Sequence, residues 1–243
     1  MIAVVIPEIN SFFYSRILAS MQAVIGDKYL LAVMCSNNSS KIEKDIVSKL
    51  NPSQIKCLII SQSMDTEDCS HLVEAKKRGI KTSIDLVSEH SDRYKLVIPC
   101  LEYVDNLIVN ELEAGAMAGI EPTLENLPAI ADKLLSYGVS ERVIIHSPSL
   151  GIVKTRNSLT VLPSYKLPEG FIKGTAGAGD AFCSGALLGI YEEKSDEEIL
   201  EYATLAAISN LRAVDGTSSV DELDKLKREL GNLPRQTLKV NYN

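Results

Sequence analysis

Short runs of branched apolar residues alternate along this chain with longer segments in which apolar residues recur every three or four positions. The short runs predict β-strands and the longer segments predict amphipathic helices. The predicted strands span residues 2–6, 29–35, 57–61, 81–86, 106–109 and 142–147. Most of these runs are apolar throughout, which is typical of strands buried on both faces of a parallel sheet. The pattern therefore predicts an α/β protein, with helices covering both sides of a mainly parallel central sheet in three layers.

The predicted helices lie between these strands and after them. They span residues 14–25, 40–50, 67–78, 111–118, 124–137, 179–192, 196–214 and 220–230. Gly79, Gly119 and Gly138 each follow a predicted helix end, where glycine is favoured. Two further β-like runs, 151–155 and 158–162, are separated by two residues and predict a hairpin.

The composition indicates an ordinary globular protein without extreme features. The chain has 243 residues, 45% hydrophobic and 23% charged, enough for one large domain or two smaller ones. Its net charge of −7, with scattered acidic residues, disfavours a nucleic-acid partner. The five cysteines are irregularly spaced, so we expect neither a disulfide framework nor a zinc site. The first apolar run meets Pro7 and Glu8 after five residues, which excludes a signal peptide or membrane anchor there, and we expect a cytoplasmic protein.

The strongest chemical signal is a glycine-rich turn, Gly-Thr-Ala-Gly-Ala-Gly at residues 174–179, that leads directly into an apolar helix. The amides at a helix start have no partner inside the helix, and the helix dipole is positive there, so this turn predicts a phosphate site. Asp180 would lie beside a bound phosphoryl group, where a carboxylate could accept the proton of an attacking hydroxyl. The alternative for so short a motif is that Asp180 caps the helix and the glycines only turn the chain.

Residues 175–182, Thr-Ala-Gly-Ala-Gly-Asp-Ala-Phe, resemble the D-T-x-G-A-G-D-x-F signature of the ribokinase-like (PfkB) carbohydrate kinases. Upstream, residues 104–115 resemble the family's strand followed by N-x-x-E, with Asn110 and Glu113 at the motif positions. Three further segments resemble a central strand, the strand and turn beside the nucleotide, and the loop that closes over the adenine. These segments are residues 81–86, 143–151 and 206–217, in the order of the family. The resemblance covers about residues 65–231.

This resemblance implies transfer of the γ-phosphoryl group of ATP to a hydroxyl group of a sugar or nucleoside. It makes Asp180 the general base, with the amides of Gly177, Ala178 and Gly179 stabilising the charge of the transition state. Asn110 and Glu113 would arrange Mg²⁺ through its water shell. The residues implied to bind the nucleotide are Asn110, Glu113, Thr175, Ser147, Gly151, Asn210 and Gly216.

For three residues the sequence allows two interpretations of their role. His146 either lines the nucleotide pocket by its family position or is an ordinary histidine at a strand end. Asp85 and Glu89 either face the substrate or are solvated acids with a structural role. Cys183 is expected to pack on the buried face of its helix.

Residues 1–62 depart from the family. The opening G-D-x-x-x-D strand, the small β lid and the G-G-x-x-x-N segment have no counterpart in them. Residues 2–18, 36–40 and 42–47 instead resemble the first βαβαβ unit of lactose-repressor-type sugar-binding domains. In those domains the segment around Asn10, Phe12 and Phe13 lies by the sugar cleft; the alternative is that Phe12 and Phe13 are core anchors at the start of a helix. We therefore predict a flavodoxin- or periplasmic-binding-like unit over 1–62, packed on the same sheet as a kinase-like body over 63–243. Such a combination indicates a chimera without a lid.

These departures leave two functions open. Gly174 stands where the family has an Asp that it links to a monovalent-cation site and to loop rigidity. Loss of the lid predicts slow or absent turnover, because a misplacement of about 1 Å can cost roughly a hundredfold in rate. The chain is then either an ATP-dependent sugar kinase or a non-catalytic scaffold or sugar-binding module that retains the kinase motifs. The acceptor and the oligomeric state are not predicted, since the lid that mediates the family's usual dimer is missing.

Overall fold

The computed structural model describes most of the chain in two compact units, Met1–Lys81 and Thr82–Asn243, which we call unit 1 and unit 2. The described residues are 1–11, 14–15, 18–19, 21–22, 29–63, 70–86, 92–215, 218–219, 221–240 and 242. The division falls at the start of the strand predicted over 81–86, whereas the sequence placed the domain boundary after residue 62. Each unit is described by itself.

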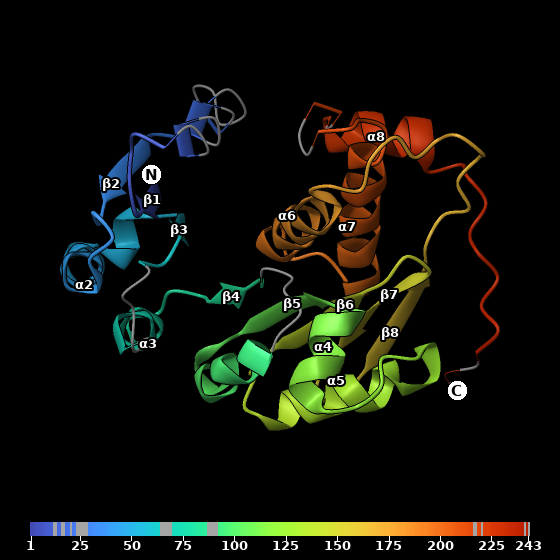
Figure 1. Ribbon diagram of the computed structural model, residues 1–243, viewed down its shortest axis with the longest axis horizontal. Coiled ribbons are helices and arrows are strands. Elements are labelled where there is room, and N and C mark those ends of the chain that lie inside the picture. The colour runs from blue at the N-terminus through green and yellow to red at the C-terminus, as the bar shows by residue number, and fades with distance from the viewer. Residues whose placement is uncertain are drawn as a thin grey trace. The chain divides into compact units, whose positions relative to one another are not determined.

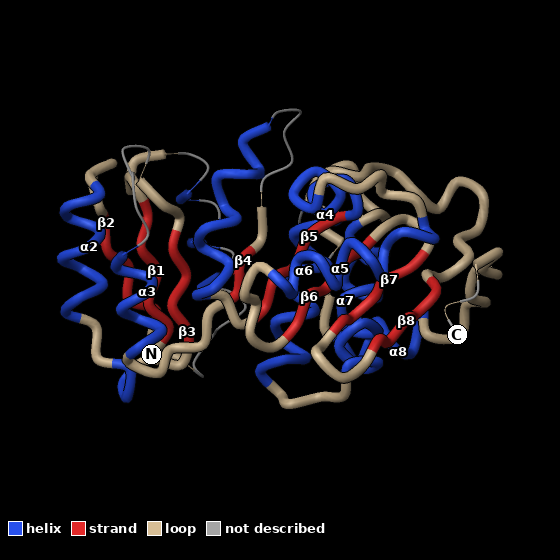
Figure 2. Tube along the Cα trace, turned by 90° about the horizontal axis from the view of Figure 1, so that it is seen from below, coloured by secondary structure: helices blue, strands red, loops and turns tan. Residues whose placement is uncertain are grey.

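Unit 1 contains a sheet of three parallel strands with β1 in the middle (Figure 2). The elements are β1 (Ile2–Ile6), β2 (Leu31–Cys35), α2 (Ser40–Lys49), a 3-10 turn (Pro52–Gln54), β3 (Cys57–Ile60) and α3 (Ser70–Lys77). Residues Ala3 to Ile6 of β1 are buried, as expected for a central strand that is apolar throughout. The helix predicted over 14–25 lies partly outside the described residues.

Unit 2 contains a sheet of five strands in the order β4-β5-β6-β7-β8, which Figure 1 shows with its helices. Its strands are β4 (Ser83–Ile84), β5 (Asn106–Asn110), β6 (Arg142–His146), β7 (Leu150–Lys154) and β8 (Leu159–Pro163). β4, β5 and β6 run parallel, whereas β7 and β8 pair antiparallel. The predicted hairpin is therefore confirmed as β7 and β8.

Helices cover both faces of the sheet in unit 2, α4 and α5 on one side and α6 and α7 on the other (Figure 1). The helices are α4 (Glu111–Ala118), a 3-10 turn (Leu124–Asn126), α5 (Leu127–Ser136), α6 (Ala178–Tyr191), α7 (Asp196–Asn210) and α8 (Leu223–Leu230). Alternate residues of β5 serve the two cores: Leu107 and Val109 pack with α4 and α5, and Ile108 packs with α6. The predicted layers of helix, sheet and helix are confirmed here.

Within each unit the described strands form one hydrogen-bonded sheet, and the packing of residues 1–62 on the same sheet as the rest of the chain stays a prediction. One feature of the fold differs from the sequence prediction. Residues Asp92–Tyr103 form a 3-10 helix that includes Pro99 and that the sequence did not predict. A 3-10 helix has three residues per turn, so it does not produce the 3.6-residue repeat of apolar positions from which α-helices are predicted.

Glycines let α6 and α7 pack unusually close together. A Cβ added at Gly185 would lie 2.5 Å from the carbonyl oxygen of Tyr202, and one at Gly189 would lie 3.0 Å from the Cα of Ile199. Because α6 starts at the glycine-rich turn, this close packing also fixes the direction of the helix that carries Asp180.

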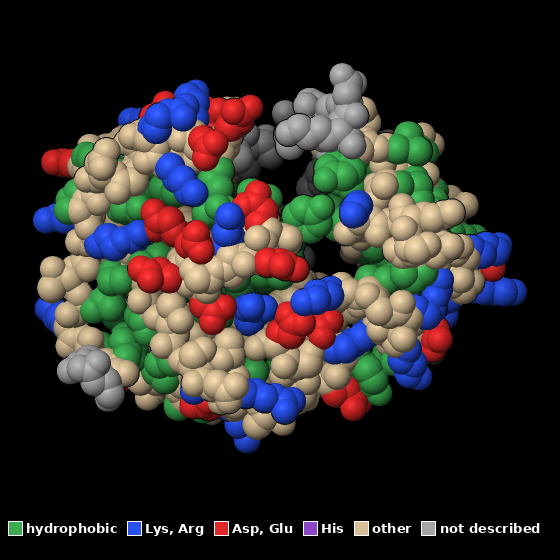
Figure 3. Space-filling model, turned by 180° about the vertical axis from the view of Figure 1, so that it is seen from behind, with side chains coloured by type: hydrophobic (Ala, Val, Ile, Leu, Met, Phe, Trp, Pro, Cys, Tyr) green, Lys and Arg blue, Asp and Glu red, His purple; other side chains and the backbone are tan. Residues whose placement is uncertain are grey.

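The length of the described helices and the charge of the surface bear on which partners the protein can have. In the part of the chain that the structure describes, none of the helices is long and apolar enough to cross a lipid bilayer. On the face drawn in Figure 3, acidic and basic side chains alternate. This mixture agrees with the scattered charges noted in the sequence.

Candidate active site

The glycine-rich turn ends in a helix N-terminus that no side chain caps. Gly177, the residue before α6, adopts a left-handed conformation with φ 77° and ψ 2°, which glycine takes without steric cost. The amide of Ala178 donates to the carbonyl oxygen of Thr175 over 3.3 Å. Amides in the first helical turn have no partner four residues earlier, so those of Gly179 and Asp180 are available to an anion.

Asp180 is exposed in the first turn of α6. In the described part of the chain, no lysine or arginine forms an ion pair with its carboxylate. One turn further, Cys183 is buried among the apolar residues of the α6 core, as predicted. Burial raises the pKa of the Cys183 thiol, and the neighbouring carboxyl groups of Asp85 and Asp180 raise it further. The thiol is therefore an inert packing group. The role of Asp180 as a general base stays a prediction.

Asp85 faces the same region from the end of β4. Its Oδ1 accepts a hydrogen bond from the backbone N–H of Leu86 at 2.9 Å. Desolvation raises the pKa of this carboxyl to about 6, with further contributions from the charges of Asp180 and Glu113. The charge of Asp180 therefore acts on the carboxyl group of Asp85. Glu89 lies outside the described residues.

The N-x-x-E motif forms a capping box at the start of α4. Oδ1 of Asn110 accepts from the backbone N–H of Glu113 at 2.9 Å, and Oε2 of Glu113 accepts from that of Asn110 at 3.0 Å. Glu113 is only 2% exposed. This reciprocal pairing satisfies two amides at the start of α4, those of Asn110 and Glu113, and it explains the spacing of the two residues by local helix chemistry.

His146 ends β6 and lies beside both motifs. Its Cα is the register partner of Asn110 on β5, and its ring stacks on Phe182 of α6 with centroids 4.5 Å apart. A Cβ added at Gly179 would lie 3.8 Å from its Cε1. Burial lowers the pKa of the imidazole to about 4, which keeps the ring neutral near pH 7. The sequence left Asp85 and His146 open, and their roles stay predictions. The signal for their closeness is their common place at the ends of parallel strands.

Ser147 and Gly151 have clear structural roles in the turn between β6 and β7. The hydroxyl of Ser147 accepts from the backbone N–H groups of Ser149 at 3.3 Å and Leu150 at 3.2 Å. Gly151 is the register partner of His146, and a Cβ there would lie 2.9 Å from Cδ2 of Leu200. Contact of either residue with a nucleotide stays a prediction.

The remaining predicted nucleotide residues lie along the turn and at the end of α7. Thr175 is exposed, and Asn210 is fully buried as the last residue of α7. A Cβ at Gly174 would lie 2.8 Å from the carbonyl oxygen of Ala213, so the turn packs against the segment that follows α7. Gly216 lies outside the described residues.

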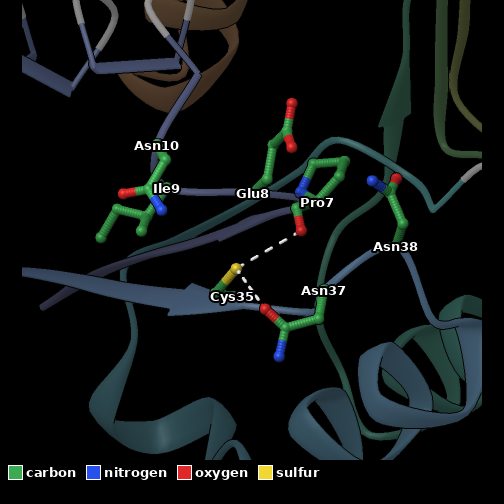
Figure 4. Close-up of a pocket in the computed structure, with 7 residues that line it drawn as sticks. All are labelled: Pro7, Glu8, Ile9, Asn10, Cys35, Asn37 and Asn38. Carbon is green, nitrogen blue, oxygen red and sulfur yellow. Dashed lines mark hydrogen bonds between the residues drawn. The ribbon is translucent and has the colours of Figure 1, made fainter.

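Unit 1 has a hollow of its own, of about 320 Å³, at the carboxyl ends of β1 and β2 (Figure 4). Its lining residues are Pro7, Glu8, Ile9, Asn10, Cys35, Asn37 and Asn38. The thiol of Cys35 donates to the carbonyl oxygen of Pro7 at 3.3 Å and to Oδ1 of Asn37 at 3.2 Å. Asn37 and Asn38 both have positive φ angles, 52° and 55°. The hollow is therefore lined by carboxamide side chains, two of which belong to residues with a left-handed backbone conformation.

A buried polar network supports the same end of unit 1. Oε2 of Glu43 accepts from the backbone N–H of Ser63 at 2.7 Å and from its hydroxyl at 2.8 Å. Oε1 of Glu43 lies 2.7 Å from Nε2 of His71, and the hydroxyl of Ser36 lies 2.8 Å from that of Ser63. These four residues are buried, and the network joins α2 to α3. No sequence signal pointed to it, because its members are distant in the chain.

Known proteins resemble this chain in sequence and in fold. A model of the pfkB family of carbohydrate kinases matches residues 21–222. A ribokinase of Schizosaccharomyces pombe is 29% identical over 147 residues, which cover 59% of this chain and 46% of that protein. A ribokinase structure from Thermotoga maritima has a TM-score of 0.64 at 20% identity, covering 95% of this chain and 80% of that one. An Arabidopsis thaliana ribokinase, solved with ribose and ATP, has a TM-score of 0.58 at 22% identity, covering 78% and 58%.

The matches define the fold and the family. An adenosine kinase of Schizophyllum commune is 36% identical over 104 residues, 36% of this chain and 28% of that protein, so the chain spans less than half of each curated relative. The solved structures show a ribokinase-like α/β fold. The family match begins at residue 21, inside the segment 1–62 that was predicted to lie outside the family, and it lends no support to a lactose-repressor-like origin of that segment. Since the match takes in far more than half of the sequence, this chain belongs to the pfkB family of carbohydrate kinases.

Proposed function

We propose that this protein transfers the γ-phosphoryl group of ATP to a hydroxyl group of a sugar or related small molecule. The observation that carries the proposal is the exposed carboxylate of Asp180 in the first turn of α6, directly after a glycine turn whose helix N-terminus has no side-chain cap. Similarity to a ribokinase and an adenosine kinase supports the class of reaction. The whole activity stays a proposal, because the chain spans only part of these relatives.

In the proposed reaction, backbone amides bind the phosphoryl group and a side-chain carboxylate accepts a proton. The amides of Gly179 and Asp180 would bind the phosphoryl oxygens and stabilise the charge that develops during transfer, whereas that of Ala178 is bonded to Thr175. The carboxylate of Asp180 would accept the proton of the acceptor hydroxyl as its oxygen bonds to phosphorus, while ADP leaves with the bridging oxygen. Because no cation pairs with Asp180 in the described residues, its carboxylate is free of competing ion pairs.

Mg²⁺ fits this site through water. When bound, the ion neutralises charge on the phosphate oxygens. The side chains of Asn110 and Glu113 are engaged with each other's backbone, and the described residues contain no cluster of three His, Cys, Asp or Glu suited to a metal. Mg²⁺ keeps several of its waters in protein sites, so Asn110 and Glu113 would orient those waters while the nucleotide supplies most direct oxygens.

Calorimetric titration with Mg·ATP, followed by turnover assays with a panel of sugars and nucleosides, tests the proposal. We expect Asp180→Asn to keep Mg·ATP binding and to lower turnover by about a hundredfold or more, the usual contribution of a general base. Ser184→Ala, which changes an exposed residue one turn further along α6, is the control and should retain activity. Equal turnover in Asp180→Asn, or no Mg·ATP binding by folded wild-type protein, would contradict the assignment.

The hollow in unit 1 favours a second function, the binding of a small hydroxyl-rich molecule without phosphoryl transfer. Carboxamides both donate and accept hydrogen bonds, which suits hydroxyl groups, and Asn10, Asn37 and Asn38 line the hollow. Calorimetry with free sugars in the absence of ATP tests this function. Binding that is lost in Asn10→Ala supports it, and binding that is unchanged in that variant argues against it.

A further inference from the structure

The last segment of unit 2, after α8, passes the end of β8 and reaches the 3-10 turn before α5 (Figure 1). At β8, Nη1 of Arg235 donates to the carbonyl oxygen of Pro163 at 2.5 Å. At the 3-10 turn, the hydroxyl of Tyr242 donates to the carbonyl oxygen of Leu124 at 2.7 Å. We call the described residues of this segment, 232–240 and 242, the C-terminal strap. The family match ends at residue 222, so the strap lies beyond it.

Arg235 fixes the strap to the body of unit 2. Its Nη2 donates to the hydroxyl of Tyr165 at 3.2 Å and forms an ion pair with Glu201 of α7. The guanidinium also lies over the Tyr165 ring, with its central carbon 4.2 Å from the ring centroid. Desolvation, together with a hydrogen bond to Glu201, raises the pKa of the Tyr165 hydroxyl to about 12, so this group stays a donor at neutral pH. An arginine held by a carboxylate, a carbonyl oxygen and an aromatic ring has little freedom to move.

The next residue, Gln236, connects the fixed strap to the turn between β6 and β7. Its backbone N–H donates to the carbonyl oxygen of Ser164 at 2.8 Å, and its side-chain Nε2 donates to the carbonyl oxygen of Pro148 at 3.0 Å. The backbone N–H of Ser164 donates in turn to the carbonyl oxygen of Ser149 at 2.8 Å. Two successive carbonyl groups of the turn are therefore held from outside it, one by the strap and one by the residue after β8.

This turn borders the candidate active site. It begins directly after His146, whose Cε1 lies 3.8 Å from the position that a Cβ on Gly179 would occupy. Its first residue, Ser147, is one of the residues that the sequence resemblance implies in nucleotide binding. The Ser147 hydroxyl accepts from the backbone N–H groups of Ser149 and Leu150, so the turn is a small hydrogen-bonded unit. A shift of the Pro148 peptide would therefore move the turn beside the glycine turn.

We propose that Gln236 is a positioning residue for the nucleotide, which holds the turn 147–150 in the place where it contacts Mg·ATP, with Arg235 as the fixed point of the strap. The inference rests on the proposed function and deepens it, because it assigns a part in nucleotide binding to a segment beyond the family match. Gln236 reaches the turn at a backbone carbonyl, so it acts through the turn and not on the reacting atoms. A turn that is held before the nucleotide arrives need not be ordered on binding, and this favours affinity.

Gln236→Leu tests the inference, because leucine keeps a side chain of similar size and removes the donor. We expect the calorimetric Kd and the KM for Mg·ATP to rise by about threefold to tenfold, as for the loss of one hydrogen bond, and kcat at saturating ATP to change by less than about twofold. Lys239→Leu, an exposed change further along the strap, is the control and should leave Kd and KM unchanged. An unchanged Kd in Gln236→Leu, or a loss of kcat at unchanged KM, overturns the inference and leaves the proposed function intact. Absence of any Mg·ATP binding by folded wild-type protein defeats the proposed function and this inference together.

Amide hydrogen exchange measures the turn itself, without a nucleotide. In Gln236→Leu we expect the amides of Ser149 and Leu150 to exchange about threefold to tenfold faster than in the wild type, and those of β6 to exchange at the wild-type rate. Arg235→Met frees the strap at its fixed point and should give the same pattern at the turn. Wild-type exchange at Ser149 and Leu150 in Gln236→Leu overturns the inference, because the strap would then not hold the turn.

Discussion

Substitution of Gly185 by alanine tests whether the close contact between α6 and α7 holds the candidate active site in place. The added Cβ would lie 2.5 Å from the carbonyl oxygen of Tyr202 and 2.7 Å from the Cα of Ala203. An ordinary contact begins at 3.4 Å, so the shortfall against the oxygen is 3.4 − 2.5 = 0.9 Å. Both obstructing atoms belong to the backbone of a buried helix, and no side chain can turn away to relieve them. The two helices must therefore separate.

The cost follows from overpacking a core that is already dense. Forcing an extra methyl group into such a core costs about 1–3 kcal/mol, against which alanine regains up to about 1 kcal/mol of helix propensity over glycine. We expect a net loss of about 1–2 kcal/mol, which for a chain of this size lowers Tm by roughly 2–8 °C. Displacement of α6 also moves Asp180, so turnover should fall as well.

Thermal and urea denaturation followed by circular dichroism measure this loss. Ser184→Ala is the control at the neighbouring position, because it places the same alanine on the exposed side of α6 by removing a hydroxyl group and adds no atom to the core; it should shift stability by less than about 0.5 kcal/mol. A Gly185→Ala protein as stable as the wild type would show that α6 and α7 are not packed backbone to backbone, and the reasoning would fail.

Three further substitutions probe the groups around the site. The pKa of Asp85 is raised to about 6, so the folded state binds the proton of this carboxyl more tightly than the unfolded state does. The stability that the protonated carboxyl contributes is therefore lost as pH rises from about 4 through about 6. Asp85→Asn should therefore stabilise the protein at pH 7.5 by up to about 1 kcal/mol, after allowance for solvent screening, and far less at pH 4; equal gains in urea melts at both pH values would refute this. Gly174→Asp should destabilise by about 1–3 kcal/mol, because its Cβ would lie 2.8 Å from the carbonyl oxygen of Ala213, and a raised Tm would contradict the packing. Asn110→Ala should cost about 1 kcal/mol through loss of the α4 cap and should raise the Mg²⁺ concentration needed for half-maximal turnover; unchanged melting would show that the cap contributes nothing.

Much of the fold was readable because burial on both faces of a sheet leaves a strong sequence pattern. The apolar run of β5 was recognisable for this reason, with Ile108 facing one core and Leu107 and Val109 facing the other. The hairpin of β7 and β8 was readable because its two strands are adjacent in sequence. The order of the strands within each sheet was not, because strand pairing joins residues distant in the chain, and no local pattern records which partners meet.

The candidate site was readable only where its chemistry is local. The glycine turn and Asp180 form one continuous motif, and the capping box of Asn110 and Glu113 is encoded by a spacing of three residues. The contact of His146 with Gly179 is different, because it depends on α6 packing across the end of β6. A Cβ at residue 179 would make an ordinary contact with the ring at 3.8 Å, and nothing in the local sequence indicates which side chain would lie there.

Two helices begin close to the carboxyl edge of the sheet in unit 2, and their N-termini differ in a way that bears on function. α4 follows β5 directly and satisfies the amides of Asn110 and Glu113 with the side chains of its own capping box. α6 begins after a glycine and has no side-chain cap, so its first amides keep their capacity for an outside anion. A helix start that supplies its own acceptor cannot also bind phosphate with the same amides. For the proposed reaction we therefore expect the phosphoryl group at the N-terminus of α6, and we expect the N-x-x-E residues to hold α4 and to orient the waters of a metal ion.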